Sequence, residues 1–386
     1  MADSPVSGPR VLFYVQHLLG IGHLARASRI AAALAADGFE VTVVTGGVAV
    51  PGFPGPGVAT VVLPAIASDQ GFSGLADPSG KPVDDAFREC RRDRLLQALA
   101  DTRPDVVVVE AYPFGRRQMR FELLPMLDAI ATMKPKPLLV TSIRDILQER
   151  VKPGRNEETV EILNRHFDLV MAHGDPNFAS LGDTFPLASA IEAEIAYTGM
   201  VAAPGANPSR ERYDVVVSAG GGAAGRLLVE AATAAAQASA SGRPWCLITG
   251  PNLPQADFDA AAAASSARLD IFRFRKDFPS LLAAAGLSVS QAGYNTVCDV
   301  LQAGCRAIYV PFAAGGETEQ TVRADRLERL GLSIAIPEAE LTPERLAAAI
   351  ERQLAKPKPP SHALDLDGAR KSAAILRGLL ERPARA

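Results

Sequence analysis

Short apolar runs rich in Val and Ile alternate along the chain with longer Ala-, Leu- and Arg-containing segments of helical period. This alternation is typical of βα units in a parallel sheet. The runs predict strands in the first half at residues 11–15, 41–44, 106–109, 138–140 and 169–171, and in the second half at residues 213–217, 245–248, 271–272, 287–289 and 307–310. The pattern therefore occurs twice, as expected for two doubly wound α/β domains in tandem.

A linker separates the two halves. Residues 199–212 contain two Pro, two Gly, Asn and Ser with few apolar residues, a composition typical of linkers. The 386 residues also exceed the size of one ordinary domain, which is about 150 residues. We therefore predict two Rossmann-like domains that face each other across a cleft, at 1–200 and 213–365, with a linker at 201–212. The segment 366–386 contains a predicted helix at 368–380 that either crosses to the first domain or packs on the second.

Polar loops follow four predicted strands of the first half. These loops begin at Gln16, Glu110, Ser142 and His173. Because ligands of open α/β sheets gather outside the carboxyl ends of the strands, the loops are expected to form one binding rim. Residues 66–94 lack a clear period and contain several Gly and Pro, so a long loop is predicted on the same rim.

Two turns in the second half are candidates for phosphate binding. Residues 218–225 are rich in Gly and precede a predicted helix, which lets the backbone approach a phosphate; alternatively, they form a tight turn that binds nothing. Residues 290–304 place Asn295 and Thr296 at a helix N-terminus and Asp299 further along that helix. The helix dipole favours a diphosphate, and Asp299 is able to accept hydrogen bonds from a ribose. Alternatively, Asn295 and Thr296 only cap the helix and Asp299 faces solvent.

The segment from Ala292 to Phe312 resembles the donor-site signature of the family of the peptidoglycan N-acetylglucosaminyltransferase that makes lipid II and, more distantly, of the UDP-glucuronosyltransferases. Over nearly the full chain, the order of features also resembles that of this family. A loop ending in Gly22 and His23 comes first, a Gly-rich turn follows, and the donor signature comes last. Residues 110–117, 120–123, 142–147 and 173–176 more narrowly resemble a bacterial subgroup of predicted glycosyltransferases. The resemblance implies the GT-B fold and transfer of a hexose from a nucleotide-diphosphate sugar.

The resemblance also implies roles in the donor site. The implied donor-binding residues are Phe274 and Arg275 for the nucleobase, Gly221, Gly222, Gly293, Tyr294, Asn295 and Thr296 for the phosphates, Asp299 for the ribose, and Glu319 and Gln320 for the hexose. The loop at 313–318 is one residue longer than in the lipid II enzyme, and Glu319 stands where that enzyme has Gln. The identity of the sugar therefore stays open.

His23 is the candidate general base. An acceptor hydroxyl must lose a proton as it attacks the anomeric carbon, and a neutral imidazole with an ordinary pKa of about 6.5 suits that step. The resemblance implies that His23 lies in the loop that presents such a residue. The alternatives are that His23 satisfies helix-terminal groups or positions a phosphate, that His17 is the base, or that Asp145 or Asp175 acts as the base or orients the imidazole.

Arginines are concentrated on the rim of the first domain, at Arg116, Arg117, Arg120 and Arg144, with Arg91, Arg92 and Arg94 nearby in sequence. Such a cluster either clamps an acceptor carboxylate or phosphate bidentately or forms salt bridges with Glu110, Glu122 and Asp145. The acceptor is expected to be anionic or lipid-linked. The predicted acceptor-binding residues are Gly22, Glu110, Arg116, Arg117, Arg144, Asp145, His173 and Asp175.

Composition narrows the functional class. The formal net charge of −3 gives no positive field that would attract nucleic acid. The four cysteines have no metal-binding spacing. No apolar run follows a basic N-terminal segment or reaches the ~20 residues of a membrane span. We expect a cytoplasmic protein with reduced thiols and peripheral membrane contact.

The sequence predicts an inverting glycosyltransferase that uses a nucleotide-diphosphate sugar, a UDP-sugar in the first place, without a metal or another cofactor. The DxD pattern of Asp365 and Asp367 lies in a Pro-flanked terminal segment, so backbone N–H groups and helix dipoles are expected to stabilise the leaving diphosphate. The alternatives are a nucleotide-sugar 2-epimerase of the same architecture and a non-catalytic nucleotide-sugar-binding subunit. A nicotinamide-dependent enzyme is disfavoured, because neither Gly-rich turn is followed by the expected ribose-binding acid.

Overall fold

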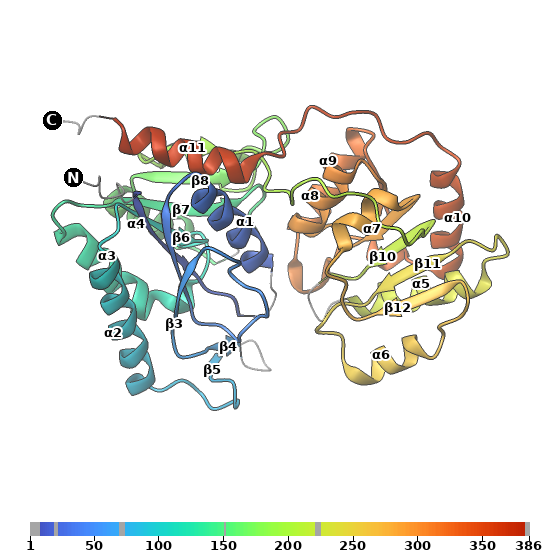
Figure 1. The fold of residues 1–386 in the computed structure, drawn as a ribbon, viewed down its shortest axis with the longest axis horizontal. Helices are drawn as coiled ribbons and strands as arrows, with labels where there is room; N and C mark the ends of the chain where they lie inside the picture. The colour runs from blue at the N-terminus through green and yellow to red at the C-terminus, as the bar shows by residue number, and fades with distance from the viewer. Residues whose placement is uncertain (1–7, 19–21, 69–73, 150–151, 221–224, 383–386) are drawn as a thin grey trace, which may run out of the picture. The chain divides into compact units, whose positions relative to one another are not determined.

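The computed structural model describes residues 8–18, 22–68, 74–149, 152–220 and 225–382, which form two units (Figure 1). The first unit contains Met1–Val201 together with Asp367–Ala386, and the second contains Ala202–Leu366. The chain therefore passes from the first unit to the second at residue 201 and returns to the first at residue 367.

The first unit is built on a seven-stranded sheet in which every neighbouring pair of strands is parallel. In spatial order the strands are β3 (Ala59–Val62), β2 (Glu40–Thr45), β1 (Arg10–Val15), β6 (Val106–Glu110), β7 (Leu138–Arg144), β8 (Leu169–His173) and β9 (Glu194–Tyr197). The chain order reverses between β1 and β6. This reversal is the topological switch point, where open α/β sheets bind their ligands.

Helices cover this sheet, as the sequence of its strands requires. The four valines of β6 are fully buried, and a run that is apolar on both faces is typical of a central parallel strand. The helices of the unit are α1 (Gly22–Ala36), α2 (Asp85–Thr102), α3 (Arg120–Thr132), α4 (Arg155–His166) and α11 (Gly368–Leu380). Figure 1 shows α2 against α3 and α1 beside α11.

The long loop predicted at 66–94 is wrong over its second part. Two short antiparallel strands, β4 (Ala67–Ser68) and β5 (Leu75–Ala76), lie in the first part, and α2 begins at Asp85. Its N-terminus is capped by the side chain of Asp84, which accepts a hydrogen bond from Phe87 N at 2.9 Å. The helical period was hidden because the buried face of α2 carries a charged residue, Arg91, where an apolar one would be expected.

The C-terminal helix lies at the predicted residues and packs on the first unit. Gly368 N donates to Met200 O at 3.0 Å, and a Cβ at Gly368 would lie 2.3 Å from Gly199 O, so this approach requires glycine. Further along α11, Arg377 pairs with Asp37 at 2.7 Å.

The second unit is built on a six-stranded parallel sheet. In spatial order the strands are β12 (Leu269–Phe272), β11 (Trp245–Ile248), β10 (Val215–Ser218), β13 (Leu287–Ser290), β14 (Arg306–Tyr309) and β15 (Ile334–Ala335). The helices are α5 (Arg226–Ala238), α6 (Gln255–Ala262), α7 (Phe278–Ala284), α8 (Tyr294–Ala303), α9 (Glu319–Arg329) and α10 (Pro343–Leu354). The chain order reverses between β10 and β13, so the two Gly-containing turns flank the switch point of this sheet.

Candidate functional site

A histidine and a glutamate meet at the switch point of the first unit. His23 lies in the first turn of α1, and Glu110 is the last residue of β6. The Nδ1 atom of His23 is 2.9 Å from Glu110 Oε1. Because β1 and β6 are neighbours in the sheet, the helix that follows one strand meets the end of the other.

Glu110 belongs to a buried chain of polar side chains. Its carboxylate also pairs with Arg26 and accepts from Ser142 Oγ at 2.6 Å. Ser142 Oγ is 2.9 Å from His173 Nε2, and His173 Nδ1 is 2.8 Å from Thr198 Oγ1. This series of polar contacts therefore runs from α1 through β6, β7 and β8 to the residue after β9. It fixes Glu110 from several sides.

The electrostatics of these buried polar side chains keep Glu110 charged and His23 neutral. Burial alone would raise the pKa of Glu110, but Arg26 and the bonds from His23 and Ser142 outweigh it and hold that pKa well below its ordinary value. Burial, helped by the charge of Arg116, lowers the pKa of His23 to about 3 against the opposing effect of Glu110. A charged carboxylate only accepts hydrogen bonds, so His23 Nδ1 carries the hydrogen and Nε2 is left as the acceptor.

The geometry of this pair is that of an imidazole and its orienting carboxylate. A carboxylate that orients an imidazole through Nδ1 also stabilises the imidazolium formed when Nε2 takes a proton. The side chain of His23 retains 22% exposure, whereas that of Glu110 has none. Glu110 therefore occupies the orienting position that the sequence suggested for Asp145 or Asp175.

His17, the alternative base, is more enclosed. It is 7% exposed, and burial lowers its pKa despite a hydrogen bond with the Val48 backbone. A Cβ at Gly47 would lie 2.2 Å from its ring, so the imidazole packs directly on the backbone of that glycine.

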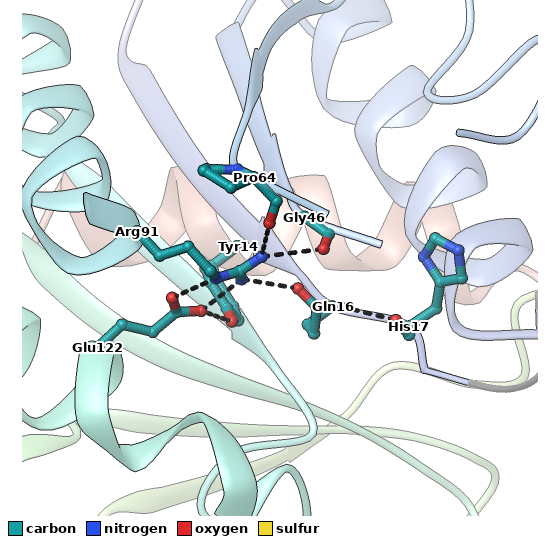
Figure 2. A network of polar contacts seen from close by, with 7 residues as sticks. All are labelled: Tyr14, Gln16, His17, Gly46, Pro64, Arg91 and Glu122. Atoms are coloured by element: carbon teal, nitrogen blue, oxygen red, sulfur yellow. Dashed lines mark hydrogen bonds and ion pairs between the residues drawn. The ribbon is translucent and has the colours of Figure 1, made fainter. Parts of the chain in front are cut away.

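A second buried network supports the loop that begins after β1 (Figure 2). Arg91, fully buried in α2, donates to Glu122 at 2.7 and 2.8 Å and to Gln16 Oε1 at 3.0 Å. Tyr14 donates to the same Glu122 at 2.5 Å, and Gln16 Nε2 donates to His17 O at 2.7 Å. Arg91 also donates to two backbone oxygens, those of Gly46 and Pro64. Of the two alternatives for Arg91, an anion clamp and a salt bridge, the salt bridge with Glu122 is thus correct.

Two predicted acceptor-binding residues belong to the buried polar side chains around the pair. Glu110 and His173 are fully buried and bonded on their polar atoms, and their contact with an acceptor stays a prediction. Asp145 and Asp175 are 3% and 5% exposed, and each accepts from a backbone N–H, of Ile146 and Asn177 respectively.

The remaining predicted acceptor residues lie near the surface of the first unit. Gly22 is exposed at the start of α1, and Arg144 is half-buried at the end of β7. Arg117 pairs with Glu158, as does Arg120. Arg116 makes no ion pair within the described part of the chain, and its charge reaches His17, His23 and Glu110.

The loop after β6 has an unusual backbone. Ala111 and Arg116 adopt φ values of 64° and 56°, a left-handed conformation that costs a non-glycine residue roughly 1–2 kcal/mol. Strained residues of this kind cluster at functional sites. No feature of the sequence indicated this strain or the parts of Arg26 and Thr198 in the polar chain, whereas Ser142 had been named as the start of a rim loop.

The second unit presents backbone groups at its switch point. Gly221 and Gly222 lie outside the described residues. In the same turn, a Cβ at Gly225 would lie 2.5 Å from Ala219 Cβ, so the strand and helix approach closely there. At the turn after β13, Gly293 precedes α8, and a Cβ added to it would meet nothing within 4 Å. The first turn of α8 contains Tyr294, Asn295 and Thr296, so its N–H groups face the same edge of the sheet.

Several predicted donor side chains already have partners. Asp299 is 7% exposed and accepts from Ala203 N at 3.2 Å. Glu319 is 2% exposed and pairs with Arg323 at 2.8 Å, while Gln320 accepts from Phe312 N at 3.2 Å. Their predicted contacts with ribose and hexose stay predictions.

The predicted nucleobase segment lies after β12. Phe274 is 56% exposed. Arg275 pairs with Asp277 at 2.7 Å and with Glu211 at 2.8 Å, so its guanidinium is held and only its backbone is available to a base.

The sequence and the fold are both similar to those of known glycosyltransferases. Residues 215–374 match the Glycosyltransferase family 28 C-terminal domain, and residues 22–145 match the Glycosyl transferase 4-like domain. CalG4, the calicheamicin glycosyltransferase, is similar over 98% of this chain and 100% of its own, with a TM-score of 0.63 and 18% identity. The chain has the GT-B fold. MurG of Acinetobacter baumannii has the same fold, with a TM-score of 0.54 and 16% identity over 97% of this chain and 98% of its own.

Curated relatives confirm the predicted resemblance to the lipid II N-acetylglucosaminyltransferase family. The UDP-N-acetylglucosamine--N-acetylmuramyl-(pentapeptide) pyrophosphoryl-undecaprenol N-acetylglucosamine transferase of Methylobacterium radiotolerans is 34% identical over 103 residues, 27% of this chain and 28% of that protein. The protein of the same name from Nitrosococcus oceani is 41% identical over 91 residues, 24% of this chain and 25% of its own. The match spans about a quarter of the length of these relatives. Both matched domain families and the GT-B fold are those of glycosyltransferases.

The described part of the chain has neither a group of metal ligands nor a helix able to span a membrane. Within the described residues, no three His, Cys, Asp or Glu side chains are grouped so as to hold a metal ion. Among the helices of those residues, none has the length and apolar character that crossing a bilayer requires.

Proposed function

We propose that this GT-B protein transfers a hexose, with inversion, from a nucleotide-diphosphate sugar to an acceptor hydroxyl, with His23 as the general base. The observation that carries the proposal is the His23–Glu110 pair at the switch point of the first unit, 2.9 Å apart. The matches to glycosyltransferase domains over 22–145 and 215–374 support it.

The chemistry is a single displacement. The acceptor oxygen forms a bond to the anomeric carbon while the bond from that carbon to the diphosphate breaks, and the diphosphate leaves with the electron pair. The proton of the acceptor hydroxyl passes to His23 Nε2. Glu110 holds the ring through Nδ1 and stabilises the positive charge that develops on it.

The second unit is proposed to bind the donor. The N–H groups at the start of α8 supply partial positive charge for the diphosphate, without a metal or another cofactor. Asp299 is proposed to accept hydrogen bonds from the ribose, and the segment after β12 to contact the nucleobase. The name of the curated relatives includes UDP-N-acetylglucosamine, which supports a UDP-sugar as the donor.

The acceptor is proposed to be anionic or lipid-linked. The relatives named above act on a pyrophosphoryl-undecaprenol acceptor according to their name, and arginines surround the loop after β6. A cytoplasmic protein with peripheral membrane contact is consistent with such an acceptor.

Calorimetric titration with UDP, GDP, dTDP and ADP in the presence of EDTA tests the donor half. We expect micromolar binding of UDP, and about ten- to a hundredfold weaker binding by Asp299→Ala, since a hydrogen bond to a charged group contributes about 1.5–3 kcal/mol. Asp270→Ala, which changes a carboxylate outside the proposed donor site, is the control.

Three outcomes would contradict parts of the proposal. Absence of binding by every nucleotide would refute the donor site, and equal binding of UDP by Asp299→Ala would refute the ribose contact. Conversion of a UDP-sugar to its 2-epimer without any acceptor, followed by NMR, would identify an epimerase instead.

A further inference from the structure

A fully buried arginine contacts the turn that precedes α8 in the second unit. Arg323 belongs to α9 and is 0% exposed. Its Nη2 atom donates to Glu319 Oε1 at 2.8 Å, and its Nη1 atom donates to the backbone oxygen of Ala292 at 2.9 Å. The guanidinium carbon also lies 5.8 Å from the centroid of the Tyr294 ring, within the range of a cation–π contact. Arginine is almost never fully buried unless it is paired, so its role lies in these contacts.

The carbonyl that Arg323 holds lies between two regular elements. Ser290, the last residue of β13, still accepts a backbone hydrogen bond at 2.8 Å, and α8 starts with the bond from Val297 N to Gly293 O at 3.0 Å. Ala292 lies between these bonds and is fully buried. Because a buried carbonyl without a partner is unfavourable, this turn requires a donor from elsewhere in the fold. Arg323 supplies it in a charge-assisted hydrogen bond.

The planarity of the peptide bond carries this contact to the other side of the turn. The Ala292–Gly293 peptide is trans, so its C=O and N–H groups point in opposite directions. Because Arg323 holds the oxygen of Ala292 from the protein interior, the N–H group of Gly293 points away from the interior. Gly293 is partly exposed, and a Cβ added to it would meet nothing within 4 Å. The N–H group therefore faces the open side of the turn.

Glu319 balances the charge of Arg323. The side chains of Glu319 and Arg323 are 3% and 0% exposed, so the pair is buried and neutral as a whole. An effect of this pair on a bound diphosphate must then come through the geometry of the turn rather than through net charge. Apolar residues of similar volume often replace a buried ion pair without loss of stability, but they would leave the oxygen of Ala292 without its donor. The contact with Ala292 is thus the part of the arrangement that requires an arginine.

We propose that Arg323 is a positioning residue of the donor site. By holding the oxygen of Ala292, it orients the N–H group of Gly293 toward the diphosphate of the nucleotide sugar. This role rests on the proposed binding of the diphosphate at the start of α8. Glu319 then acts on the donor site through Arg323, separately from its predicted contact with the hexose.

Titration of the full chain with UDP by calorimetry and with uridine by NMR tests this role, both in EDTA. Substitution of one partner alone would leave the other charge buried and unpaired, so the charge-balanced double variant Arg323→Met/Glu319→Gln is used. It should bind UDP about ten- to a hundredfold more weakly, as expected for the loss of one hydrogen bond to a charged group. It should bind uridine as the parent does, because uridine has no phosphate. Neither ligand contains a hexose, so the predicted hexose contact of Glu319 does not enter the comparison.

The matched control removes another ion pair of the same unit. Arg243 pairs with Glu351 at 3.2 Å, and it precedes β11, at the opposite edge of the sheet from Gly293. Arg243→Met/Glu351→Gln should bind UDP as the parent does. The fluorescence of Trp245 in β11 shows whether the second unit of each variant is folded at the temperature of the titration.

A measurement without nucleotide tests the contact with the turn by itself. With isotope-labelled glycine, the N–H group of Gly293 should have an NMR order parameter of about 0.85 in the parent, the value of rigid backbone. The order parameter should fall in Arg323→Met/Glu319→Gln, because the peptide has lost its donor, and it should stay at the parental value in the control variant.

The outcomes separate this inference from the proposed function. If the parent binds UDP and Arg323→Met/Glu319→Gln binds it equally well, Arg323 has no positioning role, although the donor site stands. Equal losses of UDP and uridine affinity would mean a general loosening of the unit and would also overturn the role of Arg323. If the parent binds no nucleotide, the donor proposal fails, and with it the orientation toward a diphosphate. An unchanged order parameter of Gly293 in the double variant would overturn the anchoring of the turn whether or not UDP binds.

Discussion

The two switch points of this protein use different chemistry. In the first unit, charged and aromatic side chains interlock: His23 and Glu110 form one partly buried group, and Arg91 and Glu122 form a fully buried one. In the second unit, the turn before α8 offers an open Gly293 and backbone N–H groups, while Glu319 is already paired within the unit.

This difference predicts where single substitutions act. A site made of backbone groups keeps its geometry when a side chain other than its anchor Arg323 changes, because the turn and the helix dipole remain. When one side chain of an interlocked site is replaced, the site loses a reactive group and its buried charges are no longer balanced. Substitutions in the first unit should therefore have the larger effects, on catalysis and on stability, and leave nucleotide binding unchanged.

The largest effect is expected at His23. His23→Ala removes the proposed proton acceptor and should lower kcat about 10²–10⁴-fold, while UDP affinity measured by calorimetry stays at the parental value. Glu110→Gln keeps the imidazole but removes the charge that stabilises the imidazolium, so it should also lower kcat.

The matched control for His23→Ala is His166→Ala, which changes the last residue of α4 and should leave turnover unchanged. Full turnover by His23→Ala would show that His23 is not the base. A large loss of UDP affinity in that variant would contradict the separation between the two switch points.

The next effect concerns the stability of the first unit. Glu122→Gln leaves the fully buried Arg91 without its ionic partner (Figure 2), which should cost about 3–5 kcal/mol of unfolding free energy. Circular dichroism should show an earlier transition for the first unit. Trp245, the one tryptophan of the chain, lies in β11 of the second unit, so its fluorescence transition should stay in place.

Glu89→Gln changes an exposed glutamate of the same helix as Arg91 and should alter stability by less than about 0.5 kcal/mol. An equal shift of both spectroscopic transitions in Glu122→Gln would mean that the two units unfold together. An unchanged circular dichroism transition would refute the stabilising role of the Arg91–Glu122 pair.

Much of the fold was predictable because the central strands are buried on both faces. Runs such as the four valines of β6 signal a parallel sheet by composition alone. Short or exposed edge strands give no such signal, so β3, β9 and β15 were not predicted; β3, for example, has no fully buried residue. The first half of α2 was missed because Arg91 occupies its buried face.

The candidate site was predictable in part. A histidine after the first strand and a glutamate at the end of β6 were both singled out from the sequence, but their contact depends on β1 and β6 being neighbours, which only the topology reveals. For the same reason, Glu110 was expected to bind the acceptor and Asp145 or Asp175 to orient the base. Ser142 was named as the start of a rim loop, but its bond to Glu110 was not predicted, and Thr198 was not singled out, because isolated hydroxyl residues are common in strands and loops.

The smallest effect, taken for one histidine over one pH unit, is the response of the first unit's stability to pH. Burial lowers the pKa of both His23 and His173 to about 3, so these imidazoles stay neutral where an unfolded chain, with pKa values of about 6.5, takes up protons. The unfolded state then binds more protons, and each histidine should reduce stability by about 1.4 kcal/mol per pH unit below about pH 6. NMR titration of labelled histidines should show His23 and His173 neutral at pH 5. His173→Asn should remove the resonance of His173, and the free energy of unfolding should then fall less steeply as the pH falls. Titration of His173 near pH 6.5 would refute its place in the buried polar chain.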